Sequence, residues 1–225
     1  MALFGFGDPA RARDKAARSA RGPLADYYKV PLQPPSTPAD ELRLLAIDIE
    51  TTGLDAARDA WLSVGFVPVD GHSIVLAGAR NLVLRGADVG QSATIHGLTD
   101  DVIAAGLPRE DVLAATLEAL AGRVLLAHFH SIEVNFISKA CVELYGAPLV
   151  TPAVDTLDLQ RKLVAPGFND EPRPDDLRLW NARARFNLPV YGAHEALTDA
   201  LACGELYLAQ LAHRGGEPTL KSLTA

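Results

Sequence analysis

Short apolar runs alternate with longer periodic segments along most of the chain. Three apolar runs come first, at residues 42–48, 61–71 and 73–84. Asp70 and Gly71 between the second and third runs are a turn signal typical of a hairpin. Runs of this length bounded by turn signals favour buried strands. The pattern therefore predicts a three-stranded antiparallel meander.

Helical periodicity then alternates with two further strands. Residues 123–128 form a fourth apolar run, and residues 152–163 begin with a fifth that leads into a helix. The expected helices fall within residues 95–106, 109–122, 131–146, 152–163, 177–188 and 193–216. The order predicts an α/β fold, in which a mixed five-stranded sheet, an antiparallel meander followed by parallel strands, is flanked by helices.

The first 41 residues depart from this pattern. An Ala/Arg-rich piece precedes the sequence "KVPLQPPSTPADE", whose prolines favour an extended linker. Two interpretations stay open: a solvated tail, or a basic arm that helps to hold a polyanion and makes binding sensitive to salt. The expected division is a basic and then Pro-rich N-terminal extension (1–41), one domain (42–214) and a short C-terminal tail (215–225).

Composition narrows the class of protein. A formal charge of −7 argues against binding nucleic acid mainly through a broad basic surface, although carboxylates gathered at a metal site add to the same count. Cys141 and Cys203 are too few for a disulfide scaffold. Neither a secretory signal nor a run of 18 apolar residues is present. We expect a cytoplasmic protein with no membrane partner.

Two carboxylates end the first apolar run, in the sequence "LLAIDIETTGLD". Because side chains alternate across a strand, Asp48 and Glu50 project from the same face. Like charges this close repel each other, and a divalent cation between them would offset the cost. Carboxylate oxygens favour Mg²⁺ or Mn²⁺, since the chain has no Cys–His cluster typical of zinc. The alternative is an exposed strand end that carries two ordinary charges.

Two later stretches carry further candidate ligands. The fourth strand leads to His128, His130 and Glu133 at a strand-to-helix corner, where sites gather in α/β sheets, although a first-turn carboxylate is also ordinary. In "HEALTDALA", His194 precedes the last helix and Asp199 lies inside its first turns. The aspartate could hold a metal ion while the histidine, which titrates near neutral pH, acts as a base. A capping histidine and a surface aspartate would give the same pattern.

Read together, these segments resemble the DnaQ-like exonucleases, the histidine-containing (DEDDh) branch of the DEDD superfamily that includes the proofreading epsilon subunit of the bacterial replicative polymerase. "DIETTG" is similar to the first motif of that family, "AHFHSIEVNFI" to the second and "HEALTDALA" to the third. "IHGLT" (95–99) and "DTLDLQRKL" are similar to connecting segments. The likeness spans roughly residues 42–213 and implies a ribonuclease H-like fold.

The resemblance implies a 3′-to-5′ exonuclease that releases nucleoside 5′-monophosphates with two Mg²⁺ or Mn²⁺ ions. Asp48, Glu50 and Asp199 would bind the first ion, and Asp48 with Glu133 the second. His194 would be the general base. The substrate contacts that it implies are Thr51, Thr52, Gly53, Leu54 and His96.

The second motif departs from the family pattern, because Glu133 stands where aspartate is usual and Phe129 where asparagine is frequent. The motifs favour DNA as the substrate. The alternatives are an exoribonuclease that trims short RNA, a catalytically weak nucleic-acid-binding module, and a phosphatase or nucleotidase that uses the same metals. The chain ends soon after the last predicted helix, so we expect a free-standing enzyme and doubt a polymerase partner.

Overall fold

A computed structural model describes residues 9–86, 100–165, 171–192 and 194–224. Its centre is a mixed six-stranded sheet in the order β3-β2-β1-β5-β6, with β4 also paired to β2. The strands are β1 (Arg43–Thr51), β2 (Trp61–Asp70), β3 (Ser73–Ile74), β4 (Arg80–Val83), β5 (Val124–Ala127) and β6 (Ala153–Asp155). β2 runs antiparallel to β1, whereas β5 and β6 continue the sheet in parallel. The predicted fold class is confirmed.

The third predicted strand, residues 73–84, is divided into β3 and β4 by the 3₁₀ turn η1 (Leu76–Gly78). Both pieces pair with β2. Pro68 of β2 has no N–H for the ladder, so the neighbouring strand cannot stay paired there, although Val75 N–H still donates to Pro68 O at 2.8 Å. The prediction of five strands is therefore wrong, because the third predicted strand forms two strands and the sheet has six.

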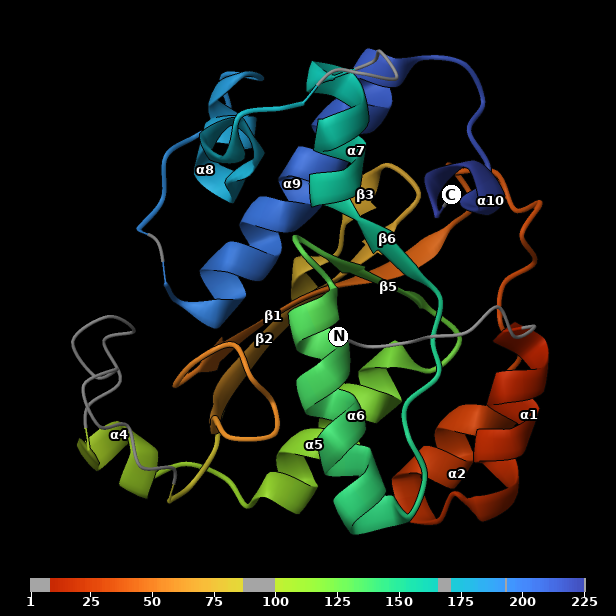
Figure 1. Ribbon diagram of the computed structural model, residues 1–225, viewed down its shortest axis with the longest axis vertical. Coiled ribbons are helices and arrows are strands. Elements are labelled where there is room, and N and C mark those ends of the chain that lie inside the picture. The colour runs from red at the N-terminus through yellow and green to blue at the C-terminus, as the bar shows by residue number, and fades with distance from the viewer. Residues whose placement is uncertain (1–8, 87–99, 166–170, 193, 225) are drawn as a thin grey trace.

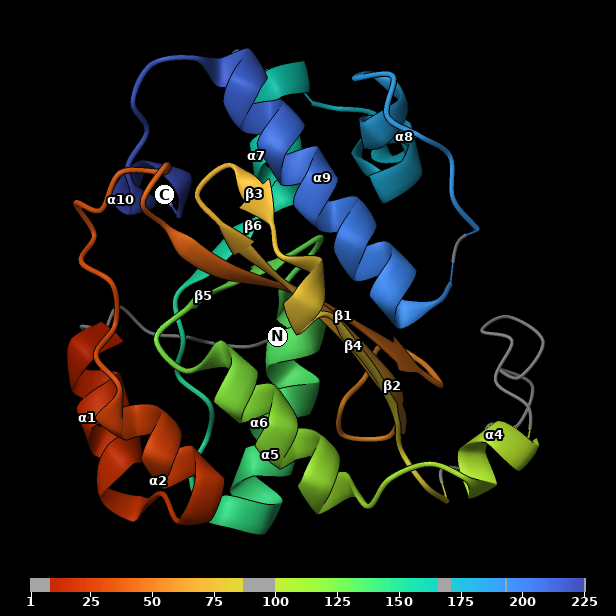
Figure 2. The same ribbon diagram turned by 180° about the vertical axis from the view of Figure 1, so that it is seen from behind.

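Helices cover both faces of the sheet (Figures 1 and 2). They are α1 (Pro9–Ser19), α2 (Gly22–Lys29), α4 (Asp100–Ala104), α5 (Arg109–Leu120), α6 (Ser131–Tyr145), α7 (Thr156–Val164), α8 (Leu179–Ala184), α9 (Ala196–Arg214) and α10 (Leu220–Leu223), with a 3₁₀ turn η3 (Pro174–Leu177). Among the described residues, no helix is long and apolar enough to cross a lipid bilayer.

β1 divides its side chains between the two layers. Leu45 and Ile47 pack into one core with α5 and α6, whereas Leu44 and Ala46 pack into a second core with α7 and α9. This alternation follows from the period of two along a strand. Asp48 is next in the second series, so the first predicted carboxylate projects from the face of the sheet that α9 covers.

The N-terminal segment is packed against the domain. Helix α2 lies beside α5 and α6, and α1 packs against α2 (Figure 1); Ala16, Leu24 and Tyr27 belong to the core on that face. A solvated tail is therefore the wrong interpretation for residues 9–29. The C-terminal segment also packs, because α10 follows a bridge between Pro38 and Thr219.

Arg13, one of the basic residues of this segment, is buried and makes contacts within the protein. Its side chain is only 9 % exposed. The guanidinium donates to the carbonyl oxygens of Val150 at 3.2 Å and Val30 at 3.0 Å, and it lies 4.8 Å from the ring centroids of both Tyr27 and Tyr28. This arginine fastens the helical hairpin to the loop before β6, so its charge is not available to a polyanion.

We expect Arg13→Ala to lower the free energy of unfolding by about 2–3 kcal/mol, because it removes buried charge-assisted hydrogen bonds. The exposed Arg18→Ala should change it by less than about 0.5 kcal/mol. Urea denaturation of both variants measures the difference. Equal free energies of unfolding in the two variants would contradict the packing of this segment and support a solvated tail.

Candidate active site

Asp48 and Glu50 lie at the carboxyl end of β1, and both carboxylates line one cleft of about 370 Å³. Glu50 is only 5 % exposed, and Asp48 is partly buried. The pairing with β2 shifts by one residue between Glu50 and Thr51. The two acidic residues therefore lie just before the position at which regular pairing with β2 ends.

Gly65 allows α9 to meet this strand end. It pairs with Asp48 in the β1–β2 ladder, and a Cβ on it would overlap the backbone of Ala196 and Leu197 in the first turn of α9. Only glycine therefore permits the helix to come this close. The contact places Asp199 beside the acids of β1.

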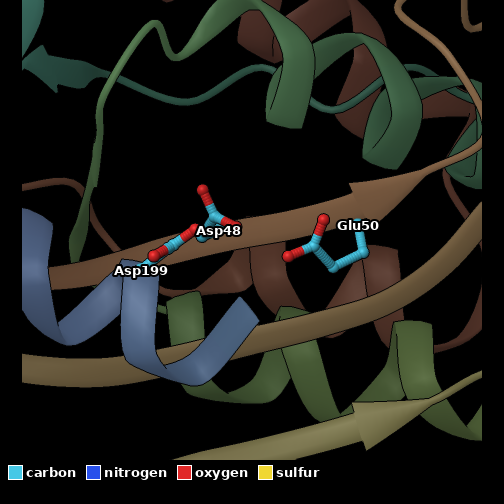
Figure 3. A group of neighbouring side chains, drawn as sticks. All are labelled: Asp48, Glu50 and Asp199. Carbon is cyan, nitrogen blue, oxygen red and sulfur yellow. The ribbon is translucent and has the colours of Figure 1, made fainter. Parts of the chain in front are cut away.

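Three carboxylates converge as a result. One ligand oxygen from each of Asp48, Glu50 and Asp199 lies within 4.8 Å of the other two. Figure 3 shows the two β1 side chains and Asp199 of α9 approaching one another across the strand end. The structure therefore brings together the three residues that the family resemblance assigns to one metal ion.

His194 is tied to Asp199 through its backbone. The His194 N–H donates to Asp199 Oδ2 at 3.0 Å, which accounts for their five-residue spacing. His194 has φ +70°, a conformation that is uncommon outside glycine. Its side chain is exposed and lines the cleft. An accessible imidazole thus stands at the mouth of the carboxylate cluster.

The loop that leads to His194 is anchored by a second network. Arg183 is fully buried between α8 and α9 and donates to Pro189 O and Glu205 Oε2, both at 2.8 Å. Tyr191 OH donates to Glu205 Oε1 at 2.8 Å. These bonds give Tyr191 a structural role three residues before His194.

Glu133 reaches the same cleft from the first turn of α6 and is only 3 % exposed. It lies outside the tight group of three, but its charge contributes to raising the pKa of Asp48. The extra methylene of glutamate still delivers the carboxylate into the cleft.

Asp155, which sequence reasoning did not single out, fixes the turn into α6. Its carboxylate accepts the backbone N–H of Phe129 at 2.9 Å and of His130 at 3.0 Å. Phe129 has φ +74°, so the turn needs such support. The same carboxylate caps α7 by accepting Leu157 N–H at 2.9 Å. In the sequence, the signal for this role is the position of Asp155 as the expected N-cap before "TLDL".

The two histidines of this turn both make hydrogen bonds within the fold. His128 contacts Thr156 Oγ1 at 2.9 Å through Nδ1 and Leu177 O at 2.7 Å through Nε2. His130 Nδ1 lies 2.7 Å from Asp155 Oδ2, which raises the pKa of His130. Of the pair, His128 lines the cleft.

The predicted substrate-contact segment 51–54 lines the cleft on its outer side. Thr51 Oγ1 donates to Gly53 O at 2.7 Å, and Thr52 Oγ1 accepts from Ala60 N–H at 2.9 Å. The two hydroxyls therefore fix the loop. Leu54 is 75 % exposed, and an apolar side chain this open is available to a ligand. His96 lies outside the described residues.

Burial and mutual repulsion disfavour the charged forms of these acids. Burial first, and Asp199 second, raise the pKa of Glu50 to about 7. Burial likewise raises the pKa of Glu133 to about 8, with a contribution from Asp155. The pKa of Asp48 is raised by burial and by its three acidic neighbours. Metal ligation requires these groups to be deprotonated, so a bound cation must overcome these shifts.

The carboxylate oxygens fit divalent cations. Glu133 Oε2 and Asp199 Oδ1 are buried, and neither has a hydrogen-bond partner among the described residues. Buried acceptors without donors are costly, and a hard cation with oxygen ligands supplies what they lack. The chemistry of this donor set fits a divalent cation.

A family model described as "Exonuclease" (RNase_T) matches residues 45–207, within the predicted domain of residues 42–214. The chain belongs to this exonuclease family. The predicted recognition of a DnaQ-like 3′-to-5′ exonuclease, a phosphodiester hydrolase, is confirmed at the level of family and enzyme class.

Curated relatives agree with the assignment. The chain is 28% identical over 195 residues to the DNA polymerase III subunit epsilon of Treponema pallidum (strain Nichols), covering 82% of this chain and 88% of the relative. It is 27% identical over 165 residues to the subunit epsilon of Aquifex aeolicus (strain VF5), covering 73% of this chain and 78% of the relative.

Solved structures show the same fold. Exonuclease I in its apo form has a TM-score of 0.62 at 17% identity, and the match covers 75% of this chain and 42% of that one. E. coli exonuclease I in complex with a dA16 oligonucleotide has a TM-score of 0.64 at 17% identity, with 75% and 40% covered. The chain thus spans about two fifths of the length of these structures.

We expect Gly65→Ala to abolish metal-dependent activity, because a Cβ overlaps the α9 backbone and must push Asp199 away from Asp48. Mg²⁺ titration by calorimetry should show at least tenfold weaker binding than in wild type. Gly204→Ala, also on α9, is the control, since a Cβ there would lie at ordinary van der Waals distance, 3.4 Å or more, from its neighbours. Wild-type Mg²⁺ affinity in Gly65→Ala would contradict this account of the site.

In metal-free protein, the free energy of unfolding should fall as pH rises from about 4.5 to about 8. The folded state holds a proton on Glu133, whose pKa rises from 4.5 to about 8, and this contribution is complete below the lower value and lost above the higher one. In Glu133→Gln the free energy of unfolding should fall over this pH range by at least about 1 kcal/mol less than in wild type. Urea denaturation in EDTA measures it, and identical slopes would refute the shift.

Proposed function

We propose that this protein is a two-metal 3′-to-5′ exonuclease that removes nucleoside 5′-monophosphates from the end of a DNA strand. The observation that carries the proposal is the convergence of Asp48, Glu50 and Asp199 within 4.8 Å, in a cleft that Glu133 and His194 also line. Family membership supplies the reaction class.

Asp48, Glu50 and Asp199 would hold one Mg²⁺ or Mn²⁺ ion, and Asp48 with Glu133 the other. When bound, the two ions would supply positive charge that stabilises the scissile phosphate in the transition state. His194 takes the proton from the attacking water, since its imidazole is exposed at the cleft and its backbone is held by Asp199. Leu54 and the loop 51–53 contact the terminal nucleotide.

DNA is the proposed substrate because the curated relatives are named as DNA polymerase III subunits and the exonuclease I structures include complexes with dT13 and dA16 oligonucleotides. An exoribonuclease is the second candidate, since the described cleft gives no reason to reject a 2′-hydroxyl. The relatives' names also leave a polymerase partner open, so a free-standing enzyme in the cytoplasm stays a prediction.

The test uses 5′-labelled 20-nucleotide DNA and RNA with Mg²⁺, Mn²⁺ or EDTA. We expect a ladder that shortens from the 3′ end and needs a divalent ion. His194→Gln should lower kcat by about 10²–10⁴-fold while the Mg²⁺ affinity stays close to wild type.

His72→Gln is the matched control, because His72 is an exposed histidine in the turn between β2 and β3. It should keep the wild-type kcat. Binding of DNA without shortening would overturn the proposed function, and loss of Mg²⁺ affinity in His194→Gln would mean that the histidine is a ligand instead of a base.

A further inference from the structure

A second pocket lies on the far side of the loop that follows β1. This pocket, of about 340 Å³, is enclosed by that loop, the end of β4 and the faces of α5 and α6. Four of its described lining residues are cationic and one is acidic: Arg58, Arg85, Arg109, Lys139 and Asp59. We call it the basic pocket. It stands out in a chain whose formal charge is −7.

The basic pocket is close to the carboxylate cleft. Gly53 lines the cleft, and a Cβ on it would lie 2.5 Å from Asp59 Oδ2, which lines the basic pocket. At this point a single segment of the loop separates the carboxylate cleft from the basic pocket. In Figure 1 the loop lies beside α6, between β1 and α5.

Helix α6 connects the two sites along one face. Glu133 lines the cleft, whereas Phe136 and Ala140, three and seven residues later, line the basic pocket. Lys139 follows Glu133 by six residues, or about 9 Å along the helix axis. A nucleic acid strand advances about 3.4 Å per nucleotide in a duplex and more in an extended single strand, so about two or three nucleotides span this distance.

The cations of the pocket can accept a new partner. Arg58 pairs with Asp55 at 2.7 Å in an exposed contact, and Lys139 lies 3.8 Å from Glu143, which also pairs with Arg109. Exposed ion pairs are worth less than about 1 kcal/mol, so phosphate can compete for these side chains.

Arg85 is also exposed. Its Nε–H donates to Gly106 O at 2.9 Å, which fixes the guanidinium. Its terminal nitrogens have no acceptor among the described residues. A planar guanidinium held in this way can donate to a phosphate through two N–H groups.

The aromatic residues of the pocket do not offer a stacking surface. Trp61 and Phe136 are buried, and Trp61 Nε1 donates to Ser63 O at 2.9 Å. Without an exposed ring there is no platform for a base. The pocket therefore fits the anionic backbone of a strand and not its bases.

We propose that the basic pocket binds the backbone phosphates of the substrate about two or three nucleotides before its 3′ end. The proposal rests on the proposed function, and it adds a contact that holds long substrates independently of base sequence. Each such contact adds about 0.7 to the salt slope of single-strand binding, or about fivefold in affinity at 0.1 M salt relative to 1 M.

The experiment compares kcat/KM on a single-stranded 20-mer with kcat/KM on a dinucleotide that has no terminal phosphate, whose single phosphate lies at the carboxylate cleft and leaves none for the pocket. Arg58→Gln with Lys139→Gln should lower the ratio of the two by about 25-fold at 0.1 M salt and reduce the salt slope by about 1.4. DNA and RNA 20-mers form separate arms, since both carry the same phosphate chemistry.

The control pair is Lys29→Gln with Lys221→Gln. It makes the same change in net charge at exposed positions on α2 and α10, and it should leave the ratio and slope as in wild type. An unchanged ratio in the pocket variant, with both substrates cleaved, would overturn this inference alone. Failure of the wild-type protein to cleave either substrate would overturn the proposed function and this inference with it.

Discussion

The burial of several carboxylates that also repel one another is the constraint on which the rest of the site depends. Asp48, Glu50 and Asp199 share one strand end, Glu133 adds a fourth acid, and their pKa values are all raised. Such an arrangement is unfavourable in the metal-free protein at neutral pH and becomes favourable only with bound cations. The fold therefore has to hold the acids together against their own charge, and stability and metal binding are linked through the same groups.

The fold holds them by close backbone approach and by fixed turns. Gly65 lets the first turn of α9 rest on β2 opposite Asp48. Asp155 ties the turn before α6, and the buried Arg183 ties the loop before α9. These contacts convert a sheet and two helices that are distant in sequence into one rigid acidic cleft.

Much of the fold could be predicted from the sequence because it follows local periodicities, whereas the roles proposed for Glu133, His194 and Asp199 came from the resemblance of the motifs to a known family. The alternation in β1 places Asp48 and Glu50 on one face, and the helical period of residues 131–146 delivers α6 with its glycine stop. Contacts between distant segments have no such local signal. The close approach at Gly65 and the burial of Arg13 depend on the neighbours that tertiary structure supplies, and the interruption of the third strand depends on Pro68 in the strand beside it.

The most direct test of the account is to locate the metal. Crystals grown with Mn²⁺ should give anomalous density between Asp48, Glu50 and Asp199, with a second peak shared by Asp48 and Glu133. Anomalous density at the cleft that contacts none of these carboxylates, or an empty cleft at saturating Mn²⁺ in a protein that cleaves DNA, would contradict the claim that the carboxylates exist to hold the cations.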